Sequence, residues 1–338
     1  MDRSFPPFYY PTNVVLLDDD TNFLKHFSLL LDPRLPCRPV SSAAAALEQI
    51  NGQPSLLHSF TELASVTMSD EAEEHTYVDL NRVHQLVYDN ERFSQITVAI
   101  IDYDMPEMNG IEVCKKINHP EIKKILLTGK ADEKLAVEAF NAGLIHQFIQ
   151  KGNDNVDKQI NQAVEKLQLE YFLDITSTIP TTLANGTVSF LADREFNSKL
   201  AKLIHKNRIV ELYFWETPRG LLMLDEAGNT EFMFVMSEDV LNTHYDMAHA
   251  CQAPEELLKY LKDRKHVPWF PTPDGYYSSD CQPDWQNRLH KVDFTCANNE
   301  HNYCSLVSPP PLDTLDVSRI LPFESYLKTF DEKYSRLP

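Results

Sequence analysis

The chain has 338 residues, of which 43% are hydrophobic, so it is long and apolar enough for two domains with buried cores. Its formal net charge of −19 extends over both halves without a long Lys/Arg run, so DNA binding is not supported by charge. Six scattered cysteines, and no apolar run near the roughly 18 residues of a membrane span, favour a cytoplasmic protein with free thiols and no membrane insertion.

The first half of the chain alternates predicted strands with predicted helices. Short apolar runs that are typical of strands occupy residues 13–20, 38–42, 96–102, 124–128 and 145–151. Helical periodicity or helix-forming composition fills the intervals between most of them. This alternation predicts an α/β fold with a doubly wound, parallel five-stranded sheet that is covered on both faces.

Charged and polar side chains stand where several of these strands end. They are Asp18 and Asp19 after the first strand, Asp102, Thr128 and Lys151. The carboxyl ends of parallel strands meet at one edge of a sheet, where ligands bind. Clustered carboxylates repel one another unless a hard cation such as Mg²⁺ lies among them. A carboxylate can also accept a phosphoryl group covalently, and an ammonium and a hydroxyl stabilise the charge on that group.

Four motifs in a fixed order carry a family resemblance: LLDDD, IIDYDMPEMNG, ILLTG and FIQK. Together they resemble the CheY-like receiver domain of two-component response regulators, which has a flavodoxin-like fold. The resemblance implies that Asp102 is the phosphoacceptor. It also implies an Mg²⁺ site made by Asp18, Asp19, Asp102 and the backbone carbonyl of Asp104.

The same resemblance assigns further roles and a partner. Thr128, Phe148 and Lys151 match the switch and phosphoryl-binding residues, and Asp104 and Lys130 match positions that tune dephosphorylation. The phosphoryl donor would be a sensor histidine kinase or a phosphotransfer protein. The chain departs from the family where Gly152 follows the lysine in place of the usual proline. It departs again in the long separation of the first acids from Asp102, which predicts an insertion around 51–92.

The rest of the chain predicts a long connecting helix and a second domain. Apolar residues at helical spacing in 155–179 form one stripe, which we expect to extend beyond the receiver and to carry the signal or pair with a second copy: Ile160, Val164, Leu167, Tyr171 and Ile175. Residues 209–216, 221–225 and 230–236 predict an antiparallel meander, followed by helices at 238–250 and 255–264 and an apolar helical stripe from Phe323 to Tyr334. The expected domains are a receiver over 1–154 and an α+β output domain over 180–338.

We therefore expect a response regulator rather than an enzyme, with only intrinsic phosphotransfer and autodephosphorylation. Phosphorylation would switch a homodimer formed through the fourth helix, fifth strand and fifth helix of the receiver. It would also switch an output domain that binds a protein or a small ligand. The whole chain is similar to Lqs-type quorum-sensing response regulators. The alternative is an output domain that binds a nucleotide or nucleic acid and regulates gene expression.

Two alternative interpretations of the polar residues remain open beside the receiver domain. A phosphohydrolase of the haloacid dehalogenase type would use Asp18 and Asp20 as its Asp-x-Asp pair, but no convincing acidic pair follows Lys151. A zinc site is the second rival, although the paired short spacings of a zinc module are absent and buried free thiols are favoured. Its ligands would come from Cys281, His290, Cys296, His301 and Cys304.

Overall fold

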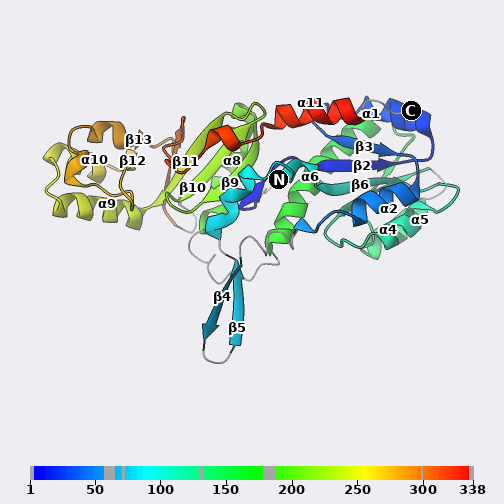
Figure 1. The fold of residues 1–338 in the computed structure, drawn as a ribbon, viewed down its shortest axis with the longest axis horizontal. Coiled ribbons are helices and arrows are strands. Elements are labelled where there is room, and N and C mark those ends of the chain that lie inside the picture. The colour runs from blue at the N-terminus through cyan, green and yellow to red at the C-terminus, as the bar shows by residue number, and fades with distance from the viewer. Residues whose placement is uncertain are drawn as a thin grey trace. The chain divides into compact units, whose positions relative to one another are not determined.

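The computed structural model describes residues 4–56, 65–70, 73–78, 80–129, 133–177, 188–297 and 300–334. Contacts divide the chain into two units, and Figure 1 labels many of the elements of each. The parallel unit comprises Tyr10–Leu63, Asp89–Ile179 and Leu321–Pro338. The antiparallel unit comprises Met1–Tyr9, Ala64–Tyr88 and Pro180–Ile320. The chain therefore passes between the units several times.

The parallel unit contains the predicted five-stranded sheet, which is confirmed with the order β3-β2-β6-β7-β8 and parallel pairing throughout. Its strands are β2 (Asn13–Leu17), β3 (Cys37–Val40), β6 (Ile96–Asp102), β7 (Lys123–Thr128) and β8 (Gln147–Gln150). Its helices are α1 (Thr21–Ser28), α2 (Ala43–Asn51), the short 3₁₀ helix η2 (Arg92–Ser94), α4 (Gly110–Lys116), α5 (Glu133–Asn141), α6 (Val156–Ser177) and α11 (Phe323–Tyr334).

Continuous apolar strands place this sheet between two helix layers. Every residue of β2 and β6 is buried, as expected for strands covered on both faces. Val15 and Ala99 share one core cluster with residues of α2, α4 and α5. Their chain neighbours Val14 and Val98 point the other way, into a cluster with residues of α1 and α6. Packing of the two helix layers on the sheet holds the carboxyl ends of its strands in fixed positions.

The predicted insertion supplies elements to the antiparallel unit. Residues 65–78 form the antiparallel hairpin β4 (Ser65–Asp70) and β5 (Glu73–Val78). The helix expected at 78–88 is the 3₁₀ helix η1 (Leu80–Tyr88). The hairpin and η1 belong to the antiparallel unit, whereas α2 and β6 on either side belong to the parallel unit.

The antiparallel unit is built on a six-stranded sheet with the order β1-β9-β10-β11-β15-β14. Its strands are β1 (Phe8–Tyr9), β9 (Ile209–Trp215), β10 (Gly220–Asp225), β11 (Thr230–Ser237), β14 (Phe294–Cys296) and β15 (Asn302–Val307). The other elements are η4 (Ser189–Ala192), α8 (Arg194–Asn207), α9 (Glu238–Ala250), α10 (Glu255–Lys262), β12 (His266–Pro268), η5 (Ser279–Cys281), η6 (Trp285–Arg288), β13 (Leu289–Lys291) and η7 (Val317–Arg319). The predicted meander is β9-β10-β11, and β1 adds an edge strand that the sequence did not indicate.

The division into units differs from the predicted domain boundaries at two helices. The stripe of α6, expected to extend beyond the receiver, is buried in the parallel unit, so it is not available to a second copy. Helix α11, expected in the output domain, also belongs to the parallel unit. The Phe323 and Tyr326 rings lie 5.1 and 5.3 Å from the Phe93 ring, measured between centroids. Arg92 donates to the Leu321 carbonyl at 2.7 Å.

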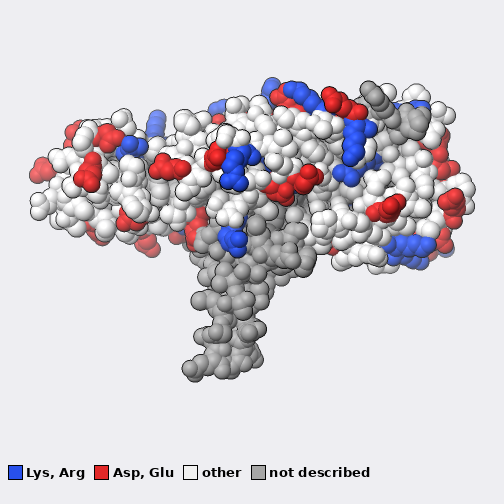
Figure 2. Space-filling view, in the orientation of Figure 1, with Lys and Arg blue, Asp and Glu red and all other residues white. Residues whose placement is uncertain are grey.

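The described surface carries charges of both signs. In the view of Figure 2, Lys and Arg side chains form small separated groups rather than a continuous stripe. Within the described residues, no helix combines the length and the apolar character needed to cross a membrane.

Candidate functional site

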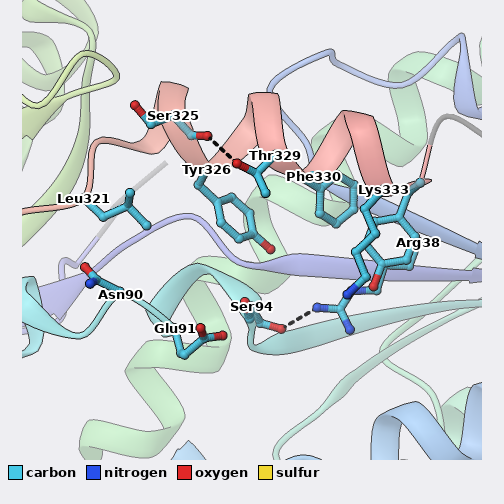
Figure 3. Close-up of a pocket in the computed structure, with 11 residues that line it drawn as sticks. Arg38, Asn90, Glu91, Ser94, Leu321, Ser325, Tyr326, Thr329, Phe330 and Lys333 are labelled. Carbon is cyan, nitrogen blue, oxygen red and sulfur yellow. Dashed lines mark hydrogen bonds between the residues drawn. The ribbon is translucent and has the colours of Figure 1, made fainter.

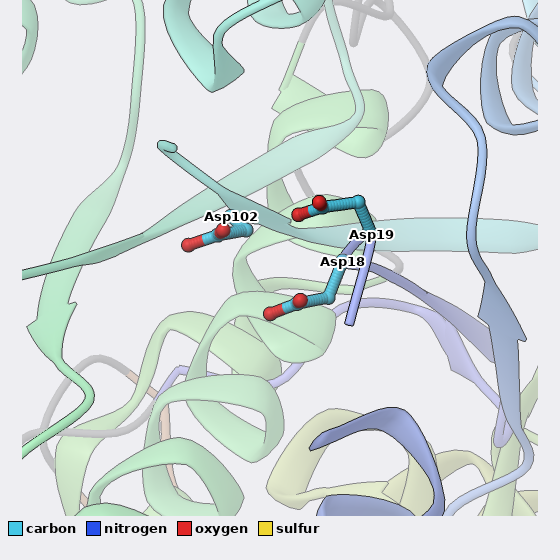
Figure 4. Close-up of side chains that lie close together, drawn as sticks. All are labelled: Asp18, Asp19 and Asp102. Atoms are coloured by element: carbon cyan, nitrogen blue, oxygen red, sulfur yellow. The ribbon is translucent and has the colours of Figure 1, made fainter. Parts of the chain in front are cut away.

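An acidic cluster forms where two neighbouring strands end. Asp18 and Asp19 directly follow β2, and Asp102 is the last residue of β6. Because β2 and β6 are paired, one carboxylate oxygen from each of these three residues lies within 4.8 Å of the others (Figure 4). Asp18 and Asp102 are only 1% and 4% exposed, whereas Asp19 is exposed. The cluster is thus buried on one side and open to solvent on the other.

Lys151 bridges the two buried carboxylates. It follows β8, and its Nζ lies 2.6 Å from Asp18 Oδ2 and 2.8 Å from Asp102 Oδ1. Burial raises the pKa of Asp102, and the charge of Asp18 adds to this, while Lys151 opposes it. Burial lowers the pKa of Lys151, but the hydrogen bonds and charges of the two carboxylates outweigh it and hold that pKa above its usual value. Lys151 is therefore a firmly protonated ammonium.

Thr128 occupies the strand end between the acid and the lysine. It is the last residue of β7, which lies between β6 and β8 in the sheet. Its side chain is fully buried, and Oγ1 has no hydrogen-bond partner among the described residues. The Lys151 backbone N–H donates to the Thr128 carbonyl at 3.0 Å, which ties the two strand ends together. A buried hydroxyl without a partner is suited to bind an incoming oxygen.

The loop after Asp102 is held close to the strand ends. The Tyr103 N–H donates to the Leu127 carbonyl at 2.9 Å, and the Gly110 N–H donates to the Tyr103 carbonyl at 3.0 Å. A Cβ added at Gly110 would lie 2.3 Å from the Asp102 carbonyl oxygen, so only glycine fits there. Asp104 is exposed in this loop, and Lys130 lies outside the described residues.

Phe148 lies on β8, three residues before Lys151. It is half-buried and packs against the core cluster that contains α4 and α5. Its ring centroid is 6.3 Å from that of Phe140, an exposed residue of α5. The aromatic side chain thus lies at the border between the core and the α5 surface.

Two residues beside the acidic cluster have contacts that the sequence did not predict. Asp20 caps α1, because its Oδ1 accepts the N–H groups of Asn22 and Phe23. The Phe23 ring lies 4.5 Å from Lys151 Nζ and shields it from one side. Helical periodicity places Phe23 on α1, but no sequence signal links it to a lysine so distant along the chain.

The donor set fits Mg²⁺, because three clustered carboxylates offer the oxygen ligands that this cation prefers. The candidate zinc ligands do not assemble in the part of the chain that the structure describes. Cys281 packs beside Trp285 in one cluster, whereas Cys296 and Cys304 belong to another. His290 stacks on Phe234 with ring centroids 5.1 Å apart. These residues are separate parts of two cores.

The strand order and the acid–lysine–hydroxyl edge define a receiver domain, and the chain belongs to the response regulators. The family model for the response regulator receiver domain matches residues 71–165. The matched range omits β2 to α2, although these elements belong to the same sheet. Over its whole length, the chain is similar to the structure of the Legionella pneumophila response regulator LqsR. The identity is 32%, the TM-score is 0.82, and the match covers 100% of both chains.

Two further solved structures match about half of the chain. One is an adenylate cyclase from Rhodopirellula baltica, with 20% identity, a TM-score of 0.35 and coverage of 50% of this chain and 94% of that one. The other is a CheY-like receiver domain protein from Methanospirillum hungatei JF-1, with 18% identity, a TM-score of 0.33 and coverage of 48% and 98%. The comparison with curated proteins gave no match.

Proposed function

We propose that this response regulator accepts a phosphoryl group on Asp102 from a sensor histidine kinase or a phosphotransfer protein. Asp18, Asp19 and Asp102 would hold Mg²⁺, with the Asp104 carbonyl as a further ligand. The observation that carries this proposal is the Lys151 ammonium, 2.8 Å from the Asp102 carboxylate and beside the unpartnered Thr128 hydroxyl. The family membership supports it independently.

The transfer follows from the side chains at this edge. A carboxylate oxygen of Asp102 attacks the phosphorus of a phosphohistidine, the P–N bond breaks, and its electron pair returns to the imidazole nitrogen. An acyl phosphate forms on Asp102. When bound, Mg²⁺ neutralises charge on the phosphoryl oxygens. Lys151 does the same from the neighbouring end of β8, and the Thr128 hydroxyl donates to a phosphoryl oxygen. Thr128 would move toward the phosphoryl group as it donates, and the Phe148 side chain would move inward into the space that Thr128 leaves.

Phosphorylation with a small phosphodonor such as acetyl phosphate, read by intact-protein and peptide mass spectrometry, tests the acceptor. We expect one Mg²⁺-dependent phosphoryl group on Asp102, and none in the Asp102→Asn variant, whose circular dichroism should match that of the wild type. Asp104→Asn is the matched control, because it changes an exposed acid two residues away and should still be modified. A phosphoryl group on Asp104 or Asp20 would overturn the proposal.

We also propose a phosphorylation-dependent homodimer through α5 and β8. The supporting observation is exposed apolar surface on α5: Leu135, Val137 and Phe140 are 41%, 39% and 47% exposed. Phe148 contacts Phe140, so an inward movement of Phe148 would change this surface. A charge placed there, Phe140→Glu, should prevent dimerisation. Leu30→Glu is the control, since Leu30 is similarly exposed, at 53%, outside α5.

Light scattering at micromolar concentration, with and without the phosphodonor, measures the mass of the assembly. The proposal requires a dimer only in the phosphorylated wild type and in the Leu30→Glu control. A monomer under both conditions, or a dimer unaffected by Phe140→Glu, would contradict it.

For the antiparallel unit we propose a protein- or ligand-binding output in quorum-sensing signalling. The Lqs-type resemblance and the full-length similarity to LqsR support this role. The alternative, an output that binds nucleic acid, is disfavoured by the net charge of −19 and by the scattered basic groups in Figure 2. Fluorescence anisotropy with labelled duplex DNA and single-stranded RNA at low salt distinguishes the two. Saturable, tight binding would favour the alternative.

A further inference from the structure

The parallel unit contains a groove that none of these roles uses. It has a volume of about 440 Å³, and helix α11 forms one wall (Figure 3). The opposite wall comes from β3 and from the residues around η2, which precede β6. Asp102 ends β6 and Ser94 precedes its start, so the groove lies toward the opposite end of the sheet from the acidic cluster. A molecule in the groove would not touch the phosphorylation site.

One end of the groove is cationic. Arg38 of β3 and Lys333 of α11 both line it, and Figure 3 shows them together at this end. The Tyr334 ring lies 5.5 Å from the Arg38 guanidinium carbon and 5.3 Å from Lys333 Nζ. Arg38 donates through Nη2 to the Ser94 carbonyl at 2.9 Å, the dashed line in Figure 3, whereas its Nε is buried without a hydrogen-bond partner. Neither cation has a carboxylate partner among the described residues. Two cations without carboxylate partners in so acidic a chain are suited to bind an anion.

The other end has the opposite character. Asn90 and Glu91 lie there, separated from the cations by the length of the groove in Figure 3. Glu91 is exposed, and its carboxylate has no partner among the described residues. At this end, the Glu91 carboxylate can accept hydrogen bonds from N–H groups, and the Asn90 amide can both donate and accept.

Aromatic surface connects the two ends. Tyr326 points from α11 into the groove, and its ring lies 5.9 Å from that of Phe330. The Tyr326 hydroxyl donates to Asn13 Oδ1 at 3.0 Å, which fixes the orientation of the ring. A flat ligand can stack on such a ring without a requirement for its own polar atoms.

The wall formed by α11 is preformed. Arg92 is 2% exposed and donates to the carbonyls of Asp89 and Leu321, at 3.0 and 2.7 Å. Its guanidinium also lies 4.0 Å from the Phe93 ring centroid, and Phe93 packs on Phe323. A wall held in this way loses little conformational entropy when a ligand binds.

We propose that this groove binds a purine nucleoside monophosphate. Arg38 and Lys333 would hold the phosphate, and the Tyr326 ring would stack on the base. Glu91 and Asn90 would meet the polar edge of the base. The volume falls in the usual range of small-ligand sites, and a guanidinium is well matched to phosphate oxygens. Guanine is preferred over adenine, because guanine offers adjacent N–H donors to the Glu91 carboxylate.

Isothermal titration of the full-length protein with GMP, AMP, guanosine and inorganic phosphate tests this site. We expect GMP to bind one site per chain, at least about tenfold more tightly than guanosine or phosphate, as loss of a charge-assisted contact predicts. Lys333→Gln should weaken GMP binding about tenfold or more. The control Lys328→Gln should not, because Lys328 lies on the same helix, 70% exposed and paired with Glu324 outside the groove. Glu91→Gln should abolish the preference for GMP over AMP.

Each other outcome is decisive. Absence of GMP binding at millimolar concentration overturns the proposal, and so does GMP binding that is unchanged by Lys333→Gln and Glu91→Gln. Phosphate binding as tight as GMP binding shows that the base is not recognised, which also overturns it. The Asp102→Asn variant should bind GMP like the wild type, so failure of the phosphorylation proposal and failure of this one are distinguishable.

Discussion

Replacing Lys151 with methionine tests the electrostatics of the acidic cluster directly. Methionine keeps an unbranched side chain of similar length and removes the ammonium. In the wild type this ammonium lies within 2.8 Å of both buried carboxylates. Without it, Asp18 and Asp102 face each other with no cation between them, and only the exposed Asp19 side remains open to water.

The cost follows from the burial of the three side chains. Removing one partner of a buried ion pair typically destabilises a protein by about 3–5 kcal/mol, because an uncompensated charge remains. The side chains of Asp18 and Asp102 are 1% and 6% exposed, but that of Lys151 is 27% exposed. Water can therefore reach the place of the ammonium, and we expect the lower end of the range. The free energy of unfolding of the parallel unit should fall by about 3 kcal/mol at pH 7.

The loss should depend on pH in a defined direction. Without Lys151, the only large opposing influence on the Asp102 pKa disappears, while burial and the charge of Asp18 still raise it. The folded variant then binds a proton more tightly than the unfolded chain, so its stability rises as the pH falls through the folded pKa toward the unfolded value near 3.8. The raised pKa of Lys151 keeps the wild-type contribution intact at neutral pH, and that contribution is lost only as the pH rises above the ordinary lysine pKa of 10.5 and through the raised folded pKa.

Urea denaturation followed by circular dichroism, with a chelator present, measures these differences at pH 7 and near pH 4.5. Two units can give two transitions, and the one that Lys151→Met shifts is the relevant one. Lys158→Met, an exposed change on α6, is the matched control and should leave both transitions in place. Saturating Mg²⁺ should restore part of the stability of Lys151→Met. Equal destabilisation at both pH values would refute the reasoning, because lost packing rather than unpaired charge would then be responsible.

Four further substitutions have expected outcomes. Gly110→Ala should destabilise the parallel unit by about 2 kcal/mol and slow phosphorylation, because its Cβ would lie 2.3 Å from the Asp102 carbonyl oxygen. Thermal melts measure the stability, and acetyl phosphate labelling measures the rate of phosphorylation. Asp20→Ala should cost about 1 kcal/mol through loss of the α1 cap but leave phosphorylation of Asp102 intact, as the same two assays would show. Asp104→Ala and Lys130→Ala should each change the dephosphorylation rate, and a double mutant that behaves additively would show that they act separately.

Local patterns predicted most of the parallel sheet, because its signals lie within short stretches of sequence. Runs such as residues 96–102 need no distant information, since a strand buried on both faces is largely apolar. The strand ends follow from the same runs, which is why Asp18, Asp102 and Lys151 could be placed at one edge before their distances were known.

The position of α11 was not predictable in the same way. Its apolar stripe shows that the helix packs on something but does not say on which unit. That choice depends on pairs far apart in the sequence, such as Arg92 with the Leu321 carbonyl and Tyr326 with Asn13. The same limitation applies to α6, whose stripe indicates burial equally well for a helix on its own sheet and for a helix in a dimer.

The placement of α11 brings the returning chain next to the start of β6. Residues 321–334 return after the whole antiparallel unit and cover the end of the parallel sheet opposite to Asp102. The segment that leads from the antiparallel unit into α11 starts at Leu321, whose carbonyl Arg92 holds, and Arg92 lies four residues before the start of β6. The strand that ends in the proposed phosphoacceptor therefore begins next to the anchor of the returning chain.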